Sequence, residues 1–508
     1  MSARRAWIDF QLKRARNFWG EFRKSKRAII GVAILVFYTI FALAAPILTS
    51  YDPIHSQYLA GVSAAPVWWK YMPGGSSLSQ NYKVAQSSLF TQANDFQTQG
   101  WDSSSTPGTN LSVQFNSSDV GLSSAAGFPR GSEQITYSRQ AGNALPSSPG
   151  ATETISKTFY WPYNGPPSTF SGSLVVFVNS MQGVSDIALT TFIANGAIEM
   201  PLSNQTINSN LVGTRVVPAE DSNDPSVRLF FGSSTIDPAV VAFSGSGNYT
   251  YGFRIVIPDK ILPNNVNVNI SFNNLNLSMK GTSWGLLGTD QNGRDIFTQL
   301  AWGTRVSLIV GLVASFLGVV IGLVVGLLAG FLGKVVDEVL MRFTDMVLVL
   351  PGLPLLIVLA ALLGPSIWNI IIILGFLGWA GFARVIRSQV LSLRERTFIE
   401  ASKAAGSGTG HIIIRHIFPN VLGLTYVSLA LAVPTAIVSE ASLAFLGLAD
   451  PNVISWGQML NAVENSAAIT SWWWVLPPGL SIAVLSLSFV LLGYALDELL
   501  NPRLRMRR

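Results

Sequence analysis

The stretch EASKAAGSGTGHIIIRHIFPN fills residues 400–420 and separates two long apolar runs, residues 366–386 and 421–446. A membrane-spanning helix needs about 20 mostly apolar residues, and each of these runs is long enough to be one. The polar, glycine-rich segment between the two runs is therefore expected to lie at a membrane surface.

The residue types of this stretch predict a short helix, a break and a second helix. Glu400 to Ala405 favour the first helix, and three glycines are expected to break it: Gly406, Gly408 and Gly410. The apolar pattern of residues 411–418 predicts an amphipathic helix at the inner membrane face, and Pro419 marks the entry to the next run. A projecting helix of this kind suits a groove on a cytosolic partner, while an ordinary interfacial loop is the simpler alternative.

The composition is that of a membrane protein. Of the 508 residues, 49% are hydrophobic and 12% are charged, whereas soluble domains carry about 25% charged residues. The chain has no cysteine, which excludes disulfides and thiol chemistry. Its three histidines (His55, His411 and His416) cannot by themselves build a histidine-rich metal site, so no metal is expected.

Six apolar runs predict an α-helical integral membrane protein with six transmembrane helices. The runs are residues 28–48, 306–330, 346–363, 366–386, 421–446 and 476–497. The first run is too long for a signal peptide and no Ala-x-Ala cleavage site follows it, so we expect it to be an uncleaved span.

Basic residues set the expected orientation in the cell (plasma) membrane. Residues 1–27 contain nine Lys and Arg against two acidic residues, whereas residues 49–283 contain 10 against 13. Positive charge is retained in the cytoplasm, which predicts that both termini and the loop 387–420 lie inside and residues 49–283 outside. Basic charge attached to the membrane part favours topology control over nucleic-acid binding.

The predicted outer segment, residues 49–283, has the pattern of an extracellular all-β, sandwich-like domain inserted between helices 1 and 2. Its runs of β-branched or alternating residues include GSLVVFVNS (172–180), SVRLFFG (226–232) and YGFRIVIP (251–258). A composition rich in Ser, Gly and Gln predicts a poorly ordered loop within residues 73–150.

All six Asn-x-Ser/Thr sequons of the chain fall in this segment, at Asn110, Asn116, Asn204, Asn248, Asn269 and Asn276. Chance explains their number in a segment rich in Asn, Ser and Thr. A sequon can accept a glycan only on a secreted face, so the predicted topology makes these six asparagines glycosylation candidates.

Three features of the helical part carry structural or functional predictions. Gly318, Gly322, Gly326 and Gly330 recur every four residues, which predicts close approach of another helix. Glu440 lies inside the run 421–446, where an ionisable residue faces the bundle interior or a water path unless it reaches the interface. Asp290 and Asn292 precede the second run and can cap the helix that follows.

Enzyme chemistry is not predicted. GTSWG (281–285) matches a nucleophile pattern, but the two histidines after it fall on the opposite side of the membrane in the predicted topology. GKV (333–335) resembles the end of a phosphate-binding loop, but Leu328 and Val335 break that pattern, so no nucleotide site is evident.

The stretch 400–420 resembles the EAA loop of ABC importer permeases in Glu400-Ala401, Gly406 and Pro419, with Ser402 in place of the second alanine. RHIFPN (415–420) resembles the form used by dipeptide and oligopeptide permeases. Five further motifs are similar to the same subfamily: LGTDQNGRD (287–295), GTRVSLIVG (303–311), EASLAFLGL (440–448), SWGQML (455–460) and NPRLR (501–505). The resemblance covers residues 1–48 and 284–508 and excludes the long insert.

The resemblance implies the ABC importer permease fold, with helices 2–6 in residues 284–508. It implies that the loop couples to separate ATPase subunits through Glu400, Ala401, Ser402, Ala405, Gly406, Arg415, His416 and Pro419. Possible pore or gate residues are Glu440, Asp290, Arg294 and Asp295.

The resemblance also implies partners. These are a second homologous permease subunit, two ATPase subunits that carry the ATP and Mg, an extracellular substrate-binding protein and the lipid bilayer, with no cofactor on this chain. The expected function is half of the translocation pore of an ATP-driven importer of di- and oligopeptides. Import of oligosaccharides or nickel by the same machinery is one alternative. A glycosylated, membrane-anchored adhesion or sensor protein is another, although an anchor needs only one span.

Overall fold

The computed structural model describes residues 20, 22–118, 131–147, 149–232, 235–261 and 264–500. Most of the predicted basic N-terminal segment and the NPRLR motif lie outside these residues. The chain forms two compact units, which we call the helical unit (Met1–Gln57 and Arg294–Arg508) and the β unit (Tyr58–Gly293). The β unit extends to Gly293, ten residues beyond the predicted end of the insert at residue 283. Asp290 therefore belongs to the β unit.

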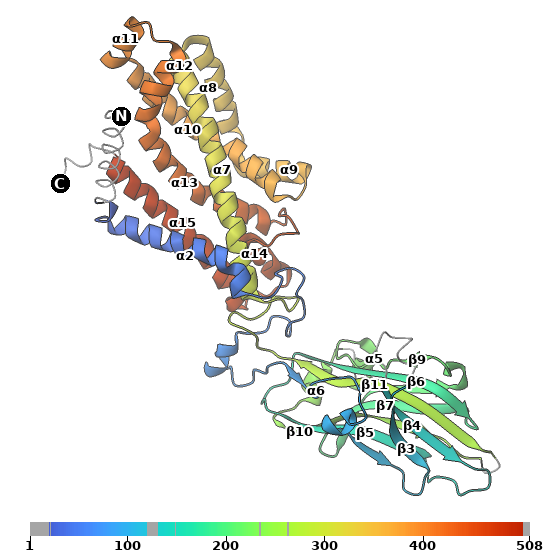
Figure 1. The fold of residues 1–508 in the computed structure, drawn as a ribbon. Coiled ribbons are helices and arrows are strands. Elements are labelled where there is room, and N and C mark those ends of the chain that lie inside the picture. The colour runs from blue at the N-terminus through green and yellow to red at the C-terminus, as the bar shows by residue number, and fades with distance from the viewer. Residues whose placement is uncertain are drawn as a thin grey trace, which may run out of the picture. The chain divides into compact units, whose positions relative to one another are not determined.

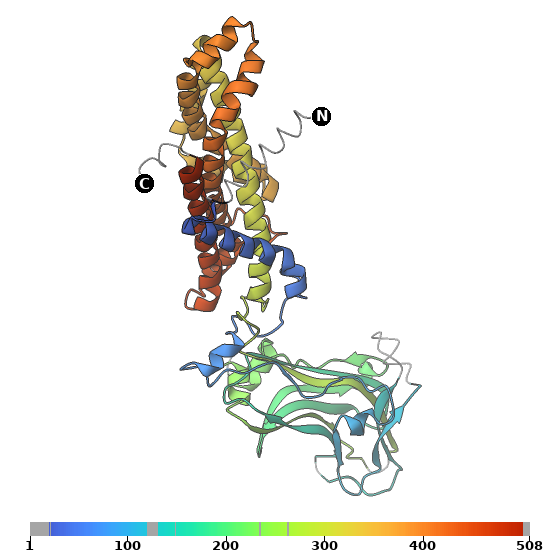
Figure 2. The same cartoon turned by 60° about the vertical axis from the view of Figure 1, so that its left-hand side comes forward.

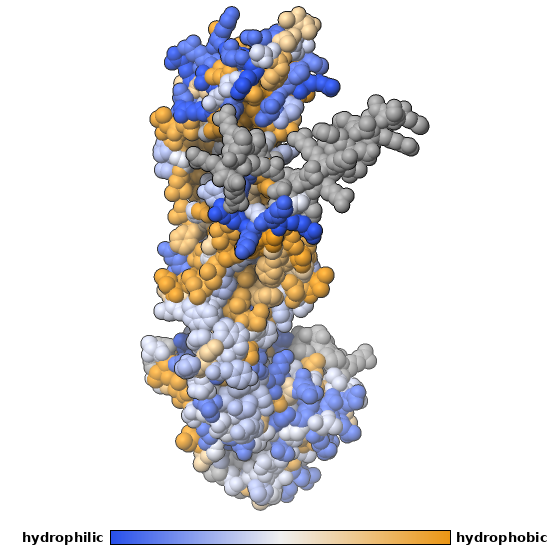
Figure 3. Space-filling view, turned by 90° about the vertical axis from the view of Figure 1, so that its left-hand side faces the viewer, coloured by the Kyte–Doolittle hydropathy of each residue, from blue (hydrophilic) through white to orange (hydrophobic). Residues whose placement is uncertain are grey.

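Five helices among the described residues are long and apolar enough to cross a membrane. They are α2 (Lys26–Leu48), α7 (Ile296–Leu332), α10 (Ile367–Arg394), α13 (Phe418–Phe445) with the turns before it, and α15 (Trp472–Leu500). Hydrophobic residues gather on the surface of this unit (Figure 3), as expected of helices that face lipid. Shorter elements connect them: α11 (Thr397–Ala404), α12 (Thr409–Ile412), η3 (Ile413–Ile417) and α14 (Trp456–Asn465).

The predicted span 346–363 is wrong as a single helix. Its residues are divided between α8 (Lys334–Val349) and α9 (Gly352–Leu363), which meet at an angle of 89°. The break lies at Pro351, which has no backbone N–H, and Leu350 before it adopts the extended backbone that a residue preceding proline prefers. The bent pair can count as a sixth span or as a re-entrant loop.

The glycines of α7 face α10 at close range, which confirms the predicted helix contact. A Cβ atom added to Gly326 would lie 2.6 Å from the backbone oxygen of Ala383, and one added to Gly322 would lie 2.7 Å from that of Trp379. Any larger side chain would push the two helices apart, so glycine at these positions sets the distance between α7 and α10.

Two antiparallel sheets make up the β unit (Figure 1). The first contains β1 (Tyr82–Lys83), β3 (Leu111–Asn116), β4 (Ser132–Arg139), β6 (Thr169–Gln182), β9 (Arg215–Val216) and β11 (Val266–Lys280). The second contains β2 (Asp102–Ser105), β5 (Ala151–Trp161), β7 (Asp186–Asn195), β8 (Ile198–Asn208) and β10 (Gly247–Ile257). Short helices lie in the connections: η1 (Val67–Tyr71), α3 (Asp95–Thr98), η2 (Ser209–Leu211), α5 (Pro225–Phe230) and α6 (Pro238–Ala242).

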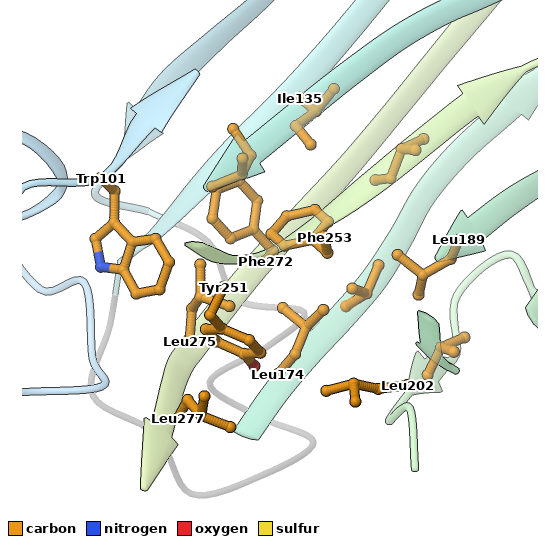
Figure 4. Close-up of a cluster of buried hydrophobic side chains, with 14 of the residues drawn as sticks. Trp101, Ile135, Leu174, Leu189, Leu202, Tyr251, Phe253, Phe272, Leu275 and Leu277 are labelled. Carbon is orange, nitrogen blue, oxygen red and sulfur yellow. The ribbon is translucent and has the colours of Figure 1, made fainter. Parts of the chain in front are cut away.

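The two sheets share one hydrophobic core, part of which Figure 4 shows. Alternate residues of β10 point into it, and Phe253 of β10 meets Phe272 of β11 edge to face, with ring centroids 5.0 Å apart. Side chains from both sheets fill the space between them, which is the packing of a β-sandwich. Two of the three predicted strand runs fall in β6 and β10.

The third run, residues 226–232, is not the predicted strand. It lies mostly in the helix α5, whose N-cap Asp224 accepts a hydrogen bond from the Ser226 backbone N–H at 2.8 Å. Pro225 occupies the first helical position, where its missing N–H costs nothing. A capping residue followed by proline therefore outweighed the apolar pattern. Within the segment predicted to contain a loop, α3 and β1 to β4 are formed, and residues 119–130 lie outside the described part.

Burial removes one of the six sequon asparagines from the glycan candidates. Asn276 is buried in β11, and its side chain forms two hydrogen bonds with the backbone of Ala85, at 2.9 and 3.0 Å. A glycan there would break both bonds, so its prediction as an acceptor is wrong. Asn110, Asn204 and Asn248 are exposed, and Asn116 and Asn269 are half-buried.

Buried carboxyl groups predict that the β unit loses stability as pH rises. Burial raises the pKa of Glu220 from 4.5 to about 7, and one of its oxygens accepts a hydrogen bond from the Tyr251 hydroxyl at 2.6 Å. Between these two pKa values the folded unit keeps a proton that the unfolded chain has lost. The contribution of protonated Glu220 to the free energy of unfolding is therefore complete below pH 4.5 and is lost between pH 4.5 and 7. The loss is about 3 kcal/mol.

Glu220→Gln is expected to remove that part of the pH dependence, because the amide stays neutral. Burial also raises the pKa of Glu133 to about 7, so the pH dependence that comes from Glu133 should remain in this variant. Hydrogen exchange of β6 and β10 in the full chain, corrected for intrinsic rates, measures the opening free energy at each pH. Asp102→Asn, at an exposed position in β2, is the matched control. Equal pH dependence in all three proteins would contradict the assignment.

Candidate functional site

The loop between α10 and α13 holds a short helix with a defined end. After α11 the backbone N–H of Ser407 donates to the Ser402 oxygen at 3.1 Å, and that of Gly406 donates to the Lys403 oxygen at 3.0 Å. These two bonds form a Schellman motif, whose central residue takes a left-handed conformation. Gly406 has φ of +79°, so glycine here serves as the helix terminator.

A single buried residue anchors α11 to the bundle. Ile399 is fully buried in an apolar cluster with Ile386 and Val390 of α10 and with Ile412 and Ile417 of the following turns. Burying one isoleucine side chain contributes about 2 kcal/mol, enough to hold a helix that is too short to be stable alone. The opposite face of α11 is left outward.

The outward face of α11 is small and carries one negative charge. Glu400, Ala401, Ala404 and Ala405 are exposed, and Ser402 is half-buried. Across the described residues, the Glu400 carboxylate has neither an ion pair nor a side-chain hydrogen bond. A flat face of alanines with a carboxylate at its start can enter a groove on another protein without losing any contact inside this chain.

The second arm of the loop begins with α12 and continues into α13. Gly410, which was predicted to help end the first helix, lies within α12. Pro419 occupies one of the first positions of α13, at the predicted entry to that span, and the helical stretch Thr409–Phe445 continues through it. Pro419 cannot donate to the carbonyl one turn earlier, and the wider π turn η3 precedes it. Arg415 is exposed on this arm.

His416 joins the two arms. Its ring lies 6.4 Å from that of Phe398 on α11 and 5.9 Å from that of His411, measured between centroids. Phe398 is 44% exposed beside Glu400, so it adds an apolar contact to the outward surface. Phe398 was not among the residues predicted from the sequence, although an aromatic residue directly before Ile399 was an available signal.

Ion pairs beside this loop were also missed. Arg387 of α10 bonds both carboxylate oxygens of Asp337 in α8, at 2.5 and 2.7 Å, and Arg384 pairs with Asp345. The partners lie 50 and 39 residues apart in sequence, beyond the reach of local pattern reasoning. The two ion pairs hold α8 against the C-terminal end of α10, which leads into α11.

Glu440 is buried within the helical unit, with 2% of its surface exposed. A cavity of about 360 Å³ lies between α7, α9, α10 and α13, and its polar lining comes from Ser315, Thr435 and Ser439. Glu440 does not line that cavity and instead faces the segment before α14 and its first turn, near Asp450 and Ser455. The structure therefore places this candidate inside the protein, as expected of a charge in a span.

The remaining pore candidates lie where the chain passes from the β unit into the helical unit. Asp295, rather than Asp290 or Asn292, caps α7, accepting bonds from the Thr298 backbone N–H and hydroxyl at 2.7 Å each. Asp290 is buried in the β unit and accepts from the Asn292 backbone N–H at 2.8 Å. Arg294, at the start of the helical unit, is half-buried. Both aspartates thus have local structural roles.

Two family models match this chain. Residues 318–506 match the binding-protein-dependent transport system inner membrane component, and residues 13–66 match the N-terminal transmembrane domain of oligopeptide transport permease C. The chain belongs to this family of transport permeases, which makes it a multi-pass membrane protein of an ABC importer. Residues 67–317, which contain most of the β unit, lie outside both matches.

Three relatives show the level of similarity. The chain is 37% identical to the dipeptide transport system permease protein of Bacillus subtilis over 251 residues, which are 49% of this chain and 78% of the relative. It is 39% identical to the oligopeptide transport system permease protein of Salmonella typhimurium over 235 residues, 44% and 78% respectively. A putative peptide permease protein of Brucella suis is 37% identical over 220 residues, 42% and 72%.

Two solved structures each align with part of the chain. The MetNI methionine ABC transporter, in an inward-facing conformation, aligns with 37% of this chain and 96% of its own, with a TM-score of 0.27 and 20% identity. A carbohydrate-binding module of the β-sandwich superfamily aligns with 38% of this chain and 61% of its own, with a TM-score of 0.23 and 10% identity. Both TM-scores lie below the range that indicates a shared fold.

Proposed function

We propose that this chain is the transmembrane permease subunit of an ATP-driven importer of di- and oligopeptides and forms half of its translocation pore. A second, homologous permease would complete the pore. Two ATPase subunits would supply ATP hydrolysis, and an extracellular binding protein would deliver the peptide. The peptide permeases among the relatives support this substrate class over oligosaccharides or nickel.

The observation that carries the proposal is the form of α11. It is anchored by Ile399, ended by Gly406, and presents Glu400 and small side chains outward. It lies at one end of the helical unit, the opposite end from α14 (Figure 1), and the turned view of Figure 2 shows this orange segment at the same end. Movement of an ATPase that holds α11 would be transmitted directly to α10 and α13, which flank the cavity. Such coupling needs two global states that both ligands bias.

The proposed topology places α11 in the cytoplasm and the β unit outside. Single cysteines are clean reporters because the chain has none. Ser25→Cys and Ser407→Cys are expected to react with a membrane-impermeant maleimide only in opened cells. Ser246→Cys, at an exposed position of the β unit, should react in intact cells. Labelling of Ser407→Cys from outside would overturn this orientation.

Uptake by proteoliposomes tests the substrate. The complete complex with trapped ATP is expected to accumulate a labelled peptide when the binding protein is present. Unlabelled peptides of two to five residues should compete, whereas oligosaccharides and Ni²⁺ should not. Accumulation of sugar or Ni²⁺ instead of peptide would reject the substrate class while leaving the importer assignment intact.

A further inference from the structure

The β unit carries an aromatic segment that neither its core nor the transport role uses. Residues 67–72, VWWKYM, form η1 and the residue after it, and we call them the aromatic turn. The exposed fractions of Tyr71 and Met72 are 79% and 45%. The Lys70 ammonium lies 4.9 Å from the centre of the Tyr71 ring. We propose that the aromatic turn inserts into the headgroup region of the lipid bilayer and fixes the β unit to the membrane surface.

The aromatic turn is held in place on both sides. The Val67 backbone N–H donates to the Gly285 oxygen at 3.1 Å, and the Trp68 indole donates to the Leu286 oxygen at 2.8 Å. On the far side, Ser79 accepts from the backbone N–H of Ser283 at 2.9 Å. Residues 283–286 therefore hold the chain on both sides of the aromatic turn, so little ordering cost remains for binding.

Both chain connections to the membrane helices leave from this end of the β unit. The Leu59 backbone N–H donates to the Gly293 oxygen at 2.9 Å, so entry and exit lie side by side. Leu286, which is 56% exposed, precedes the start of α7 at Ile296 by ten residues. Ten residues span at most about 35 Å, so the chain tethers this end of the unit to the start of a membrane helix.

The chemistry of the segment matches the membrane interface. Trp and Tyr are enriched at headgroup depth, and Lys places its stem along apolar groups while its charge stays in water. The chain has no acidic residue between Asp52 and Asp95, so the aromatic turn contains no carboxylate that the interface would repel. A protein partner would have to reach this surface by diffusion, whereas the bilayer always surrounds the helices to which the unit is tethered. These points favour lipid over a protein partner.

Spin labels in the full chain test the proposal, which does not depend on the side of the membrane or on the substrate. The chain alone is placed in liposomes, and each label's accessibility to oxygen is divided by its accessibility to a water-soluble nickel complex. This ratio should be several-fold higher for a label on Met72→Cys than for a label on Ser185→Cys. Ser185 follows β6, whose 14 residues run about 45 Å away from the strand end beside Lys280. It is exposed and serves as the aqueous control.

A second substitution separates insertion from local burial. Tyr71→Asp adds a carboxylate at an exposed position, so the Met72→Cys label should become as accessible to nickel as the Ser185→Cys label while the latter stays unchanged. Equal accessibility at both sites in liposomes of the unmodified turn would overturn the proposal. Protection of Met72→Cys only after the binding protein is added would also overturn it and would identify a protein-docking surface instead.

Discussion

Gly326→Leu is expected to disrupt the helical unit. The glycine faces the backbone oxygen of Ala383 at a distance that leaves no room for a Cβ, and the Ile386 side chain closes the other side. A backbone atom cannot rotate away, so α7 and α10 must separate and the neighbouring contacts are lost. Overpacking of this kind costs about 3 kcal/mol or more. The detergent-solubilised protein should show a much lower midpoint of thermal aggregation, measured by size-exclusion chromatography.

Gly381→Leu is the matched control. Gly381 lies on the same pair of helices, but a Cβ there meets no atom within 4 Å. This variant should keep the wild-type midpoint. If Gly326→Leu kept it as well, the close packing of α7 on α10 would be contradicted. A loss in both variants would mean that leucine at any of these helix positions is harmful, whatever its surroundings.

Glu400→Lys is expected to abolish the coupling of substrate to ATP hydrolysis without unfolding the protein. The side chain is exposed and makes no ion pair within the described chain, so folding loses nothing. Removing one partner of a buried, hydrogen-bonded charge pair at an interface costs about 2–5 kcal/mol, charge reversal adds like-charge repulsion, and about 1.4 kcal/mol already corresponds to a factor of ten. Stimulation of ATPase activity by peptide-loaded binding protein should therefore fall at least tenfold in reconstituted complexes.

Glu464→Lys controls for charge reversal itself. Glu464 is an exposed carboxylate on α14, another short helix, at the other end of α13. Its substitution should leave stimulation unchanged. Thermal midpoints of both variants must match the wild type for the comparison to count. A Glu400→Lys complex that responds normally to loaded binding protein would show that the carboxylate has no part in coupling.

The length of the apolar runs predicted the helical part of the fold, and alternating or β-branched runs predicted the β part, because burial acts on every residue of a long element. Five of the six apolar runs coincide with single helices, and the four-residue glycine spacing predicted the close helix contact that α7 makes with α10. The predictions were wrong where one or two residues determined the local backbone conformation. Pro351 turned one predicted span into two helices, and Asp224 with Pro225 made a helix of a strand-like run.

The sites were predictable only as far as local rules reach. Helix and turn chemistry predicted that Gly406 ends a short helix, and the structure gives Gly406 the left-handed backbone that a helix terminator needs. The role proposed for Glu400 comes from the resemblance to ABC importer permeases. The pair of Arg387 with Asp337 joins residues far apart in sequence, so only the fold reveals it. Burial of Asn276 likewise depends on the chain segment that covers β11. A sequon alone does not contain that information.

The proposal that α11 is the surface on which this permease meets its ATPases can be tested by contact itself. A benzophenone maleimide attached to Ala401→Cys, at an exposed position of α11, is irradiated in the assembled complex, with Glu464→Cys as the matched site on α14. We predict that the ATPase subunit is covalently captured at Ala401→Cys and not at Glu464→Cys. We also predict that the yield changes when ATP is bound. Capture of no ATPase at Ala401→Cys, or equal capture at both sites, would contradict the central claim.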